Sequence, residues 1–322
     1  MTRQYLRTAE LTFEKGSDTI TIGGEAGSTL RFSFSVEHGD KMSPNRAAIK
    51  VYNLAQSSEA KFLKELGKVS LSAGYPGNVG LIFKGEIIQT FTGKDSPVDS
   101  FVFSLASDAD TAINYGVVNK ALAAGHTYRD QVMECFKAFQ PHGVELGFIA
   151  DLGSKRFPRG AVLTGMAVDK LRTIAFATQC SPSIQNGKFQ MVKNTGTLPG
   201  GAIVLNSRTG MIGRPQQTIG GIVVRTLLNP RIVVGAIVQI DQNSIDRQVF
   251  DASYTGAVTN TLIPDVTVDG LYKVLYVDHQ GDTRSSDWYT TATCVALSSN
   301  KGIPISQAQR GISLGEPMAG QN

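Results

Sequence analysis

The chain has 322 residues, of which 41% are hydrophobic and 18% are charged, and its formal net charge is +4. This length suits two or three domains, with cores large enough to fold without disulfides. The weak positive charge, without a cluster of lysines and arginines, argues against sequence-specific nucleic-acid binding.

The cysteines and the apolar segments indicate in which compartment the chain folds. Cys135, Cys180 and Cys294 lie far apart, and they show neither the even number of a disulfide framework nor the CxxC spacing of a zinc site. We therefore expect free thiols and folding in a reducing cytoplasm. No run of 18 apolar residues and no signal-peptide core occur, so we expect neither membrane insertion nor export.

The first third of the chain predicts β-strands. Residues 30–36 and 69–75 alternate between apolar and polar, and residues 81–88 and 101–105 are two further strand-like runs. Gly85 lies in the middle of one run, which indicates a bulge or a sharp bend.

A short helix is expected between these strands. Ser57 or Ser58 can cap it, and Gly67 can end it. We assign residues 1–108 to a first β-barrel domain, with this helix as a plug across one end.

The pattern changes to helices in residues 109–200. Thr127 is the expected N-cap of an amphipathic helix, and a second helix follows Gly165. Their apolar faces recur at helical spacing: Val132, Cys135, Phe136 and Phe139 in the first, and Ala167, Leu171, Ile174 and Ala175 in the second. Asn186-Gly187 predicts a hairpin over residues 183–192. Residues 109–200 are thus expected to form a small α+β domain.

Strands return in the last third. Residues 221–228, 236–240, 271–277 and 288–297 are β-rich runs bounded by turn residues. They predict a second β-barrel domain over residues 201–300, with a long loop at 244–264. Residues 301–322 are polar and glycine-rich, which is typical of a tail or arm. The expected fold class is β-rich α+β, with two β-barrels flanking the α+β domain.

No catalytic, cofactor or metal site is predicted. The four histidines are isolated from one another, and no phosphate-binding loop or nucleophile elbow occurs. His279 and Asp282 lie in a polar run, residues 278–287, between two expected strands, so we interpret this run as a hairpin loop. Glu134, with Glu145 and Asp151, could form a hydrolase pair, but a solvated surface is the favoured interpretation.

Several motifs, taken in order, resemble the central baseplate hub proteins of contractile-tailed bacteriophages. The turn-and-strand series consists of Thr209-Gly210-Met211-Ile212-Gly213-Arg214-Pro215, Gly220-Gly221-Ile222-Val223-Val224 and Leu227-Leu228-Asn229-Pro230-Arg231-Ile232, followed by Gly235. Residues 272–274, 279–283 and 287–288 resemble the closing hairpin of this family, and residues 49–54, 74–75 and 82–87 resemble its first barrel. Residues 159–165 fit its α+β insertion. The resemblance covers most of residues 30–297.

The resemblance implies a structural role without enzyme activity. Such hubs are trimers with two barrels per chain that resemble the tail-tube subunit, so that three chains adapt a sixfold tube to a threefold spike. The implied partners are two further copies of the chain, the tail tube protein, the central spike protein, the tape-measure protein and other baseplate proteins. The implied location is the virion tail, assembled in the host cytoplasm. DNA would pass through the ring, so we expect its lumen to lack a basic stripe.

Three charged residues on otherwise apolar strands, Lys84, Glu86 and Arg225, face either solvent or another subunit. Trp288, the single tryptophan, is expected in the core. Two alternatives stay open at this point. One is a tail-associated peptidoglycan hydrolase, which would need an acidic pair or a metal within residues 109–200. The other is a peripheral receptor- or carbohydrate-binding β protein, which would expose aromatic residues on loops.

Overall fold

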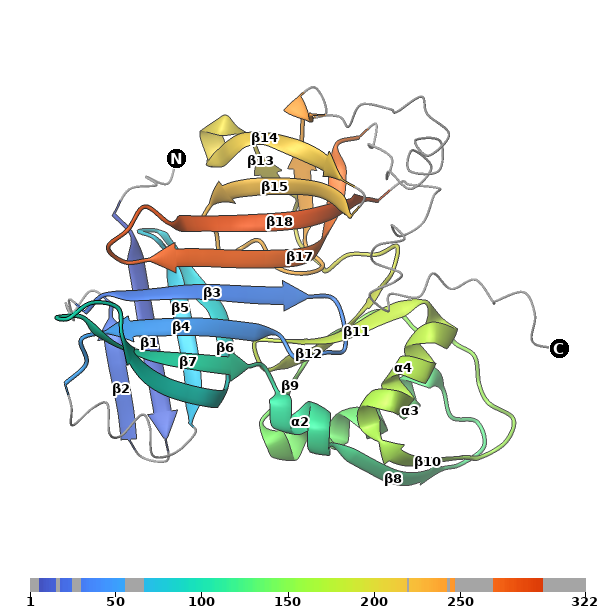
Figure 1. Cartoon of the computed structure of the whole chain (residues 1–322). Coiled ribbons are helices and arrows are strands. Elements are labelled where there is room, and N and C mark those ends of the chain that lie inside the picture. Colours follow the sequence, from blue (N-terminus) through green and yellow to red (C-terminus); the bar gives the residue numbers. More distant parts are fainter. Residues whose placement is uncertain are drawn as a thin grey trace, which may run out of the picture.

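The computed structural model describes residues 6–15, 18–24, 30–55, 67–218, 220–241, 244–246 and 269–297. The predicted helix at residues 57–66, the tail at 301–322 and most of the predicted loop at 244–264 lie outside these residues. Figure 1 shows a strand-rich body, with α3 and α4 gathered at one end beside β8 and β10. The β-rich α+β prediction is therefore confirmed.

The first region consists of strands. They are β1 (Thr8–Lys15), β2 (Asp18–Gly23), β3 (Phe32–Gly39), β4 (Arg46–Tyr52), β5 (Lys68–Tyr75), β6 (Asn78–Lys94) and β7 (Ser100–Ser107). In β3 the side chains of Phe32, Phe34 and Val36 are buried at every second position, as the sequence alternation predicts.

The middle region contains the helices. Its elements are α2 (Asp110–Tyr115), β8 (Val117–Leu122), α3 (Tyr128–Lys137), η1 (Gln140–His142), β9 (Glu145–Ile149), β10 (Ala161–Met166), α4 (Ala167–Thr178), β11 (Cys180–Gln185) and β12 (Lys188–Lys193). Thr127 caps α3 through a capping box with Asp130, and the Asn186-Gly187 turn has positive φ at both residues, as a tight hairpin requires. Both helices and the hairpin are confirmed.

The last region returns to strands. They are β13 (Ile203–Leu205), β14 (Met211–Thr218), β15 (Gly221–Leu227), β16 (Ile237–Ile240), β17 (Leu271–Asp282) and β18 (Trp288–Ala296), with the short helix η2 (Ser207–Thr209) after β13. β17 is longer than the sequence predicts, because it continues past Val277 to Asp282.

The strands of the first and last regions belong to one sheet, which has 13 strands among the described residues. Its order is β14-β15-β18-β17-β3-β4-β7-β6-β5-β1-β2, and β16 pairs with both β13 and β17. The β17–β3 pair joins the two regions (Figure 1). Closure of each region into a separate barrel stays a prediction.

The two β regions share one strand order. The first region has the order β3-β4-β7-β6-β5, and the last has β14-β15-β18-β17-β16. If the five strands of each set are numbered along the chain, both sets have the order 1-2-5-4-3 across the sheet. All neighbouring pairs in the two sets are antiparallel. The chain thus repeats one arrangement of five strands.

Gly85 marks close packing and is not itself a bulge. The register shifts of β6 fall on either side of it, between Phe83 and Leu81 and between Ile87 and Gln89. A Cβ atom at Gly85 would lie 2.5 Å from the carbonyl oxygen of Ser107, so a larger residue does not fit there.

The buried apolar side chains form three clusters. One comes from the strands of the first region together with Leu228 and Trp288, which confirms that Trp288 is a core residue. The second comes from residues 109–191 with Met42, and the third lies among the strands of the last region. Trp288 is therefore a residue of the last region that packs in the first core.

Candidate assembly interface

The structure does not bring the three charged residues named from the sequence together. Lys84 and Glu86 lie two residues apart on β6, whereas Arg225 lies on β15, in the other half of the sheet. Lys84 is exposed. Arg225 is exposed too, and its guanidinium carbon lies 4.1 Å from the ring centre of Tyr289.

Glu86 has a role within the chain. Its carboxylate accepts hydrogen bonds from the backbone amide of Thr111 at 3.2 Å and from the Thr111 hydroxyl at 2.8 Å. Thr111 lies in the first turn of α2, where a carboxylate satisfies an open amide. Contact of Lys84, Glu86 or Arg225 with another subunit stays a prediction.

A buried polar junction connects the three regions, and His38 of β3 lies within it. The ring Nε2 of His38 is 2.7 Å from the carbonyl oxygen of Ile82, and Nδ1 is 3.0 Å from Oε1 of Gln185 in β11. Both ring nitrogens thus face acceptors, which favours the protonated ring. Burial opposes this and lowers the pKa of His38 below its usual value.

Asn45 extends the junction to the hairpin of the middle region. Its amide donates to the carbonyl oxygen of Ile184 at 2.8 Å and to Oε1 of Gln185 at 3.2 Å, and its oxygen accepts from the amide of Gly39 at 3.0 Å. The Gln185 amide in turn donates to the carbonyl oxygen of Gly39 at 2.7 Å. These bonds tie the β11–β12 hairpin to the β3–β4 turn.

Lys273 connects the last region to the same hairpin. Its side chain is 2% exposed, and its ammonium donates to the carbonyl oxygens of Lys193 at 2.8 Å and Asn194 at 3.2 Å. Burial lowers the pKa of Lys273 to about 8, against the attraction of the Asp40 carboxylate. Burial also raises the pKa of Asp40, a buried residue that follows β3.

The sequence interpretation of residues 278–287 as a hairpin loop is right for residues 283–287, which connect β17 to β18. It is wrong for residues 278–282, which include His279. His279 lies within β17, it is 2% exposed, and Nδ1 lies 2.9 Å from the hydroxyl of Thr290. The polar run was misleading because β3 and β18 pair with this part of β17 from both sides. His38 was also missed, although it continues the buried positions Phe32, Phe34 and Val36 of β3.

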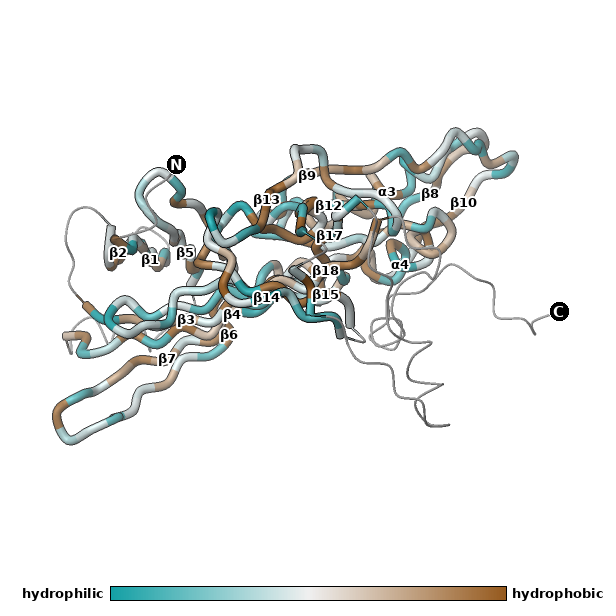
Figure 2. The backbone as a smooth tube through the Cα atoms, turned by 90° about the horizontal axis from the view of Figure 1, so that it is seen from above, coloured by the Kyte–Doolittle hydropathy of each residue, from teal (hydrophilic) through white to brown (hydrophobic). Residues whose placement is uncertain are grey.

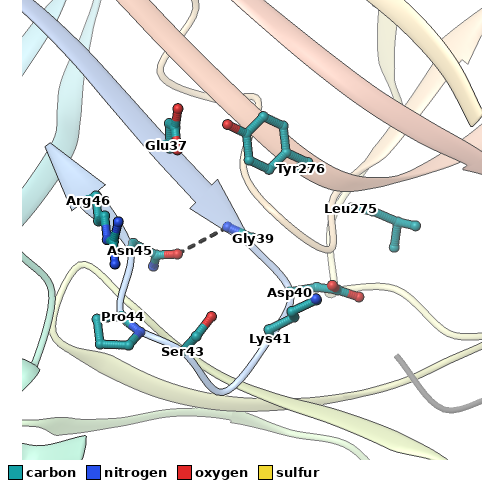
Figure 3. Close-up of a pocket in the computed structure, with 10 residues that line it drawn as sticks. All are labelled: Glu37, Gly39, Asp40, Lys41, Ser43, Pro44, Asn45, Arg46, Leu275 and Tyr276. Atoms are coloured by element: carbon teal, nitrogen blue, oxygen red, sulfur yellow. Dashed lines mark hydrogen bonds between the residues drawn. The ribbon is translucent and has the colours of Figure 1, made fainter. Parts of the chain in front are cut away.

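A surface pocket of about 320 Å³ opens beside the junction (Figure 3). It is formed by the β3–β4 turn and by Leu275 and Tyr276 of β17. The lining includes Glu37 and Arg46, which pair across β3 and β4, so charges of both signs face the opening.

Neither a metal-ion cluster nor a membrane-spanning helix is found among the described residues. They contain no group of three or more histidine, cysteine or acidic side chains that could hold a metal ion. In the same part of the chain, no helix has the length and apolar character needed to cross a membrane. All three cysteines are buried free thiols, and burial raises the pKa of Cys135 to about 11.

Known proteins match the fold and not the sequence. No family model and no curated protein matches the chain. The 43 kDa tail protein of prophage MuSo2 from Shewanella oneidensis has a TM-score of 0.55 at 9% identity, over 92% of this chain and 99% of that one. The tail protein from Neisseria meningitidis MC58 has a TM-score of 0.56 at 9% identity, over 93% and 98%.

A third solved structure extends the comparison to secretion systems. It is an E. coli protein described as a component of the type VI secretion system with structural similarity to T4 bacteriophage tail proteins. Its TM-score is 0.51 at 12% identity, over 91% of this chain and 78% of that one. The resemblance found in the sequence is confirmed at the level of fold: over nearly its whole length, this chain has the fold of phage tail proteins.

Proposed function

We propose that the chain is the central hub subunit of a contractile phage baseplate, and that three copies form a ring. The repeated five-strand order carries this proposal, because it gives each chain two similar β units. Three such chains present six similar units, which is the number needed to join a sixfold tube to a threefold spike. A cyclic assembly with one repeated contact is a common form of homo-oligomer.

We propose four segments with separate roles. Residues 1–108 and 201–300 are the two barrel domains that form the ring, 109–200 is the α+β domain, and 301–322 is an arm. The three hydrophobic clusters support this division, since each is built mainly from one of the first three segments. The junction around His38 and Lys273 would hold the segments in one orientation.

The proposed role is mechanical and needs no chemistry. The ring would let DNA pass, with tube protein on one face and spike protein on the other, and tape-measure and other baseplate proteins bound around this core. We expect the wall of the channel to lack a basic stripe, which would hold the DNA phosphates. The fold shared with tail proteins supports a place in the virion.

Copurification tests this function. We expect the full chain, produced together with the tail tube and spike proteins of the same phage, to copurify with both. Failure to retain either protein, with all three folded, would contradict the hub role. The hydrolase alternative has a separate test, because a hydrolase would clear a cell-wall suspension.

A further inference from the structure

The repeated strand order gives a residue-by-residue correspondence between the two halves of the sheet. In β6, Ile88 is the extra residue opposite β7, and in β17 Leu275 is the extra residue opposite β18. Aligning the two bulges places Thr92 of β6 at the position of His279 of β17. β-Bulges fix register, so a shared bulge is a strong marker for this alignment.

The ends of the two strands confirm the alignment. Seven residues after the bulge, the amide of Asp95 donates to the carbonyl oxygen of Asp99 at 3.0 Å. Seven residues after the other bulge, the amide of Asp282 donates to the carbonyl oxygen of Asp287 at 2.9 Å. β6 and β17 thus turn into their hairpins at matching positions.

The matching strands differ in what lies along one edge. One edge of β17 carries β16 at its start and then β3, which pairs from Tyr276 to Asp282. The same edge of β6 carries β5 as far as Glu86. Beyond Glu86, no strand of the described part of the chain pairs with this edge.

The open edge of β6, residues 88–94, is suited to add a strand. Successive backbone amides of a strand point to opposite edges. Because the amide of Asp95 points to the β7 side, the amides of Thr92 and Lys94 point to the open edge. Ile88 is 41% and Phe91 45% exposed, and the β6–β7 hairpin projects from the body in Figure 2. An exposed, partly apolar strand edge is a template for pairing with another chain.

We propose that β14 of a second copy pairs with this edge as an antiparallel strand, in the manner of the β17–β3 pair within the chain. β14 is the counterpart of β3, because each is the first strand of its five-strand order. The proposal rests on the trimeric hub proposed above and names its subunit contact. A head-to-tail contact of this kind closes into a ring when the rotation permits.

The correspondence fixes the register of the new pair. Ala106 of β7 and Cys294 of β18 each pair with the residue just before a bulge, so they correspond to each other. Their partners on the next strand, Ala47 of β4 and Ile222 of β15, therefore correspond as well. One strand further, Ala47 pairs with Val36 of β3 and Ile222 pairs with Gln217 of β14. Gln217 therefore corresponds to Val36. The next residue, Thr218, corresponds to Glu37. Within the chain Glu37 pairs with Asp278, the counterpart of Phe91. Phe91 therefore lies opposite Thr218 of the second copy.

Among the described residues, Asp246 lies against the outer edge of β14, and the new strand must displace it. Its carboxylate lies 3.3 Å from the guanidinium of Arg214, and its backbone also bonds to β14. The amide of Gln217 donates to the carbonyl oxygen of Asp246 at 3.1 Å, and the amide of Asp246 donates to Pro215 at 2.8 Å. This backbone contact is an isolated bridge of a single residue. Two backbone hydrogen bonds and one exposed ion pair are exchanged for a longer ladder, so Asp246 protects the edge before assembly without preventing pairing.

A disulfide between copies tests the register. The amide of Phe91 points to β7, so Phe91 and Thr218 of the second copy would form a non-hydrogen-bonded pair, with Cα atoms about 4.5 Å apart. This spacing permits a disulfide. The native cysteines are buried and do not compete. We expect oxidised full-length F91C/T218C to migrate as a covalent trimer under denaturing, non-reducing conditions.

Two variants serve as controls. S35C/Q280C joins an adjacent pair of β3 and β17, so it should close within a monomer. F91C/V204C keeps the first cysteine and moves the second to exposed Val204 of β13, so it should not form the trimer.

The mass of the unmodified chain separates the two possible failures. A trimer in solution without a disulfide in F91C/T218C, while S35C/Q280C closes, would overturn this contact and leave the hub intact. A monomer at all concentrations, also in the presence of the tube and spike proteins, together with no disulfide, would contradict the trimeric hub and this contact with it.

Discussion

His38 and His279 lie ring against ring inside the protein, with centroids 6.3 Å apart and planes at 74°. One belongs to β3 and the other to β17, the two strands that join the halves of the sheet. Both rings are buried, and burial lowers both pKa values. The joint thus contains two ionisable rings whose charged forms burial disfavours.

The first prediction concerns pH. The pKa of His279 in the folded protein is about 3, lowered from 6.5 by burial and by His38. Below pH 6.5 the unfolded chain binds a proton that the folded chain does not. The free energy of unfolding therefore decreases as the pH is lowered. This contribution should amount to about 2 kcal/mol between pH 8 and pH 5.

The comparison that isolates this effect is between wild type and H279Q in urea titrations at several pH values. Asp108, whose pKa burial raises to about 6, acts in the opposite direction in both proteins. The stability difference between them should therefore change with pH as His279 alone predicts. Equal pH slopes for the two proteins would contradict the prediction.

Trp288 should be the most costly residue to truncate in the joined core. Its ring meets Phe34 edge to face at 5.5 Å, and it is 1% exposed. W288A should lower the free energy of unfolding by about 3–5 kcal/mol, because a large cavity opens between the two regions. V162A, at a site 68% exposed, is the control and should change it by less than about 0.5 kcal/mol. A loss below 1 kcal/mol in W288A would contradict the core assignment.

Asn45 should hold the middle region to the first. N45A leaves the carbonyl oxygen of Ile184 and the amide of Gly39 without their side-chain partner. Each unpaired buried group costs about 1–3 kcal/mol. Hydrogen exchange should show faster exchange in the β11–β12 hairpin and the β3–β4 turn, with α3 much less affected. Unchanged exchange in the hairpin would show that this junction does not hold it.

Thr127 should contribute to the stability of α3 through its capping box. The hydroxyl accepts from the amide of Asp130, and the Asp130 carboxylate accepts from the amide of Thr127 at 2.8 Å. T127A should cost about 1 kcal/mol in thermal or urea unfolding, and T127S should recover most of it. If T127A and T127S are equally stable, the cap has no energetic role.

The sequence predicts those elements correctly whose formation depends on a few neighbouring residues. The cap at Thr127, the spacing of Val132 and Phe136, and the Asn186-Gly187 turn each act over a few residues, and all appear as expected. The β17–β3 pair could not be predicted in this way. It joins distant segments and covers polar residues such as His279, whose local pattern indicated a loop.

The candidate interface was harder to predict than the fold. Lys84, Glu86 and Arg225 are candidates because each is a charge on an otherwise apolar strand, but Glu86 accepts hydrogen bonds from Thr111 of α2 within the chain. Charge alone does not distinguish a contact inside the chain from one between chains. The open edge of β6 depends on which strands pair, and only the three-dimensional structure contains that information.

The central claim is that three copies form a ring, and the mass of the full chain in solution tests it most directly. Light scattering over a concentration series, with negative-stain imaging of the same sample, is the measurement. We predict a species of three times the chain mass of 34.5 kDa, seen as rings with a central opening. A monomer at every concentration, also in the presence of the tube and spike proteins, would contradict the claim.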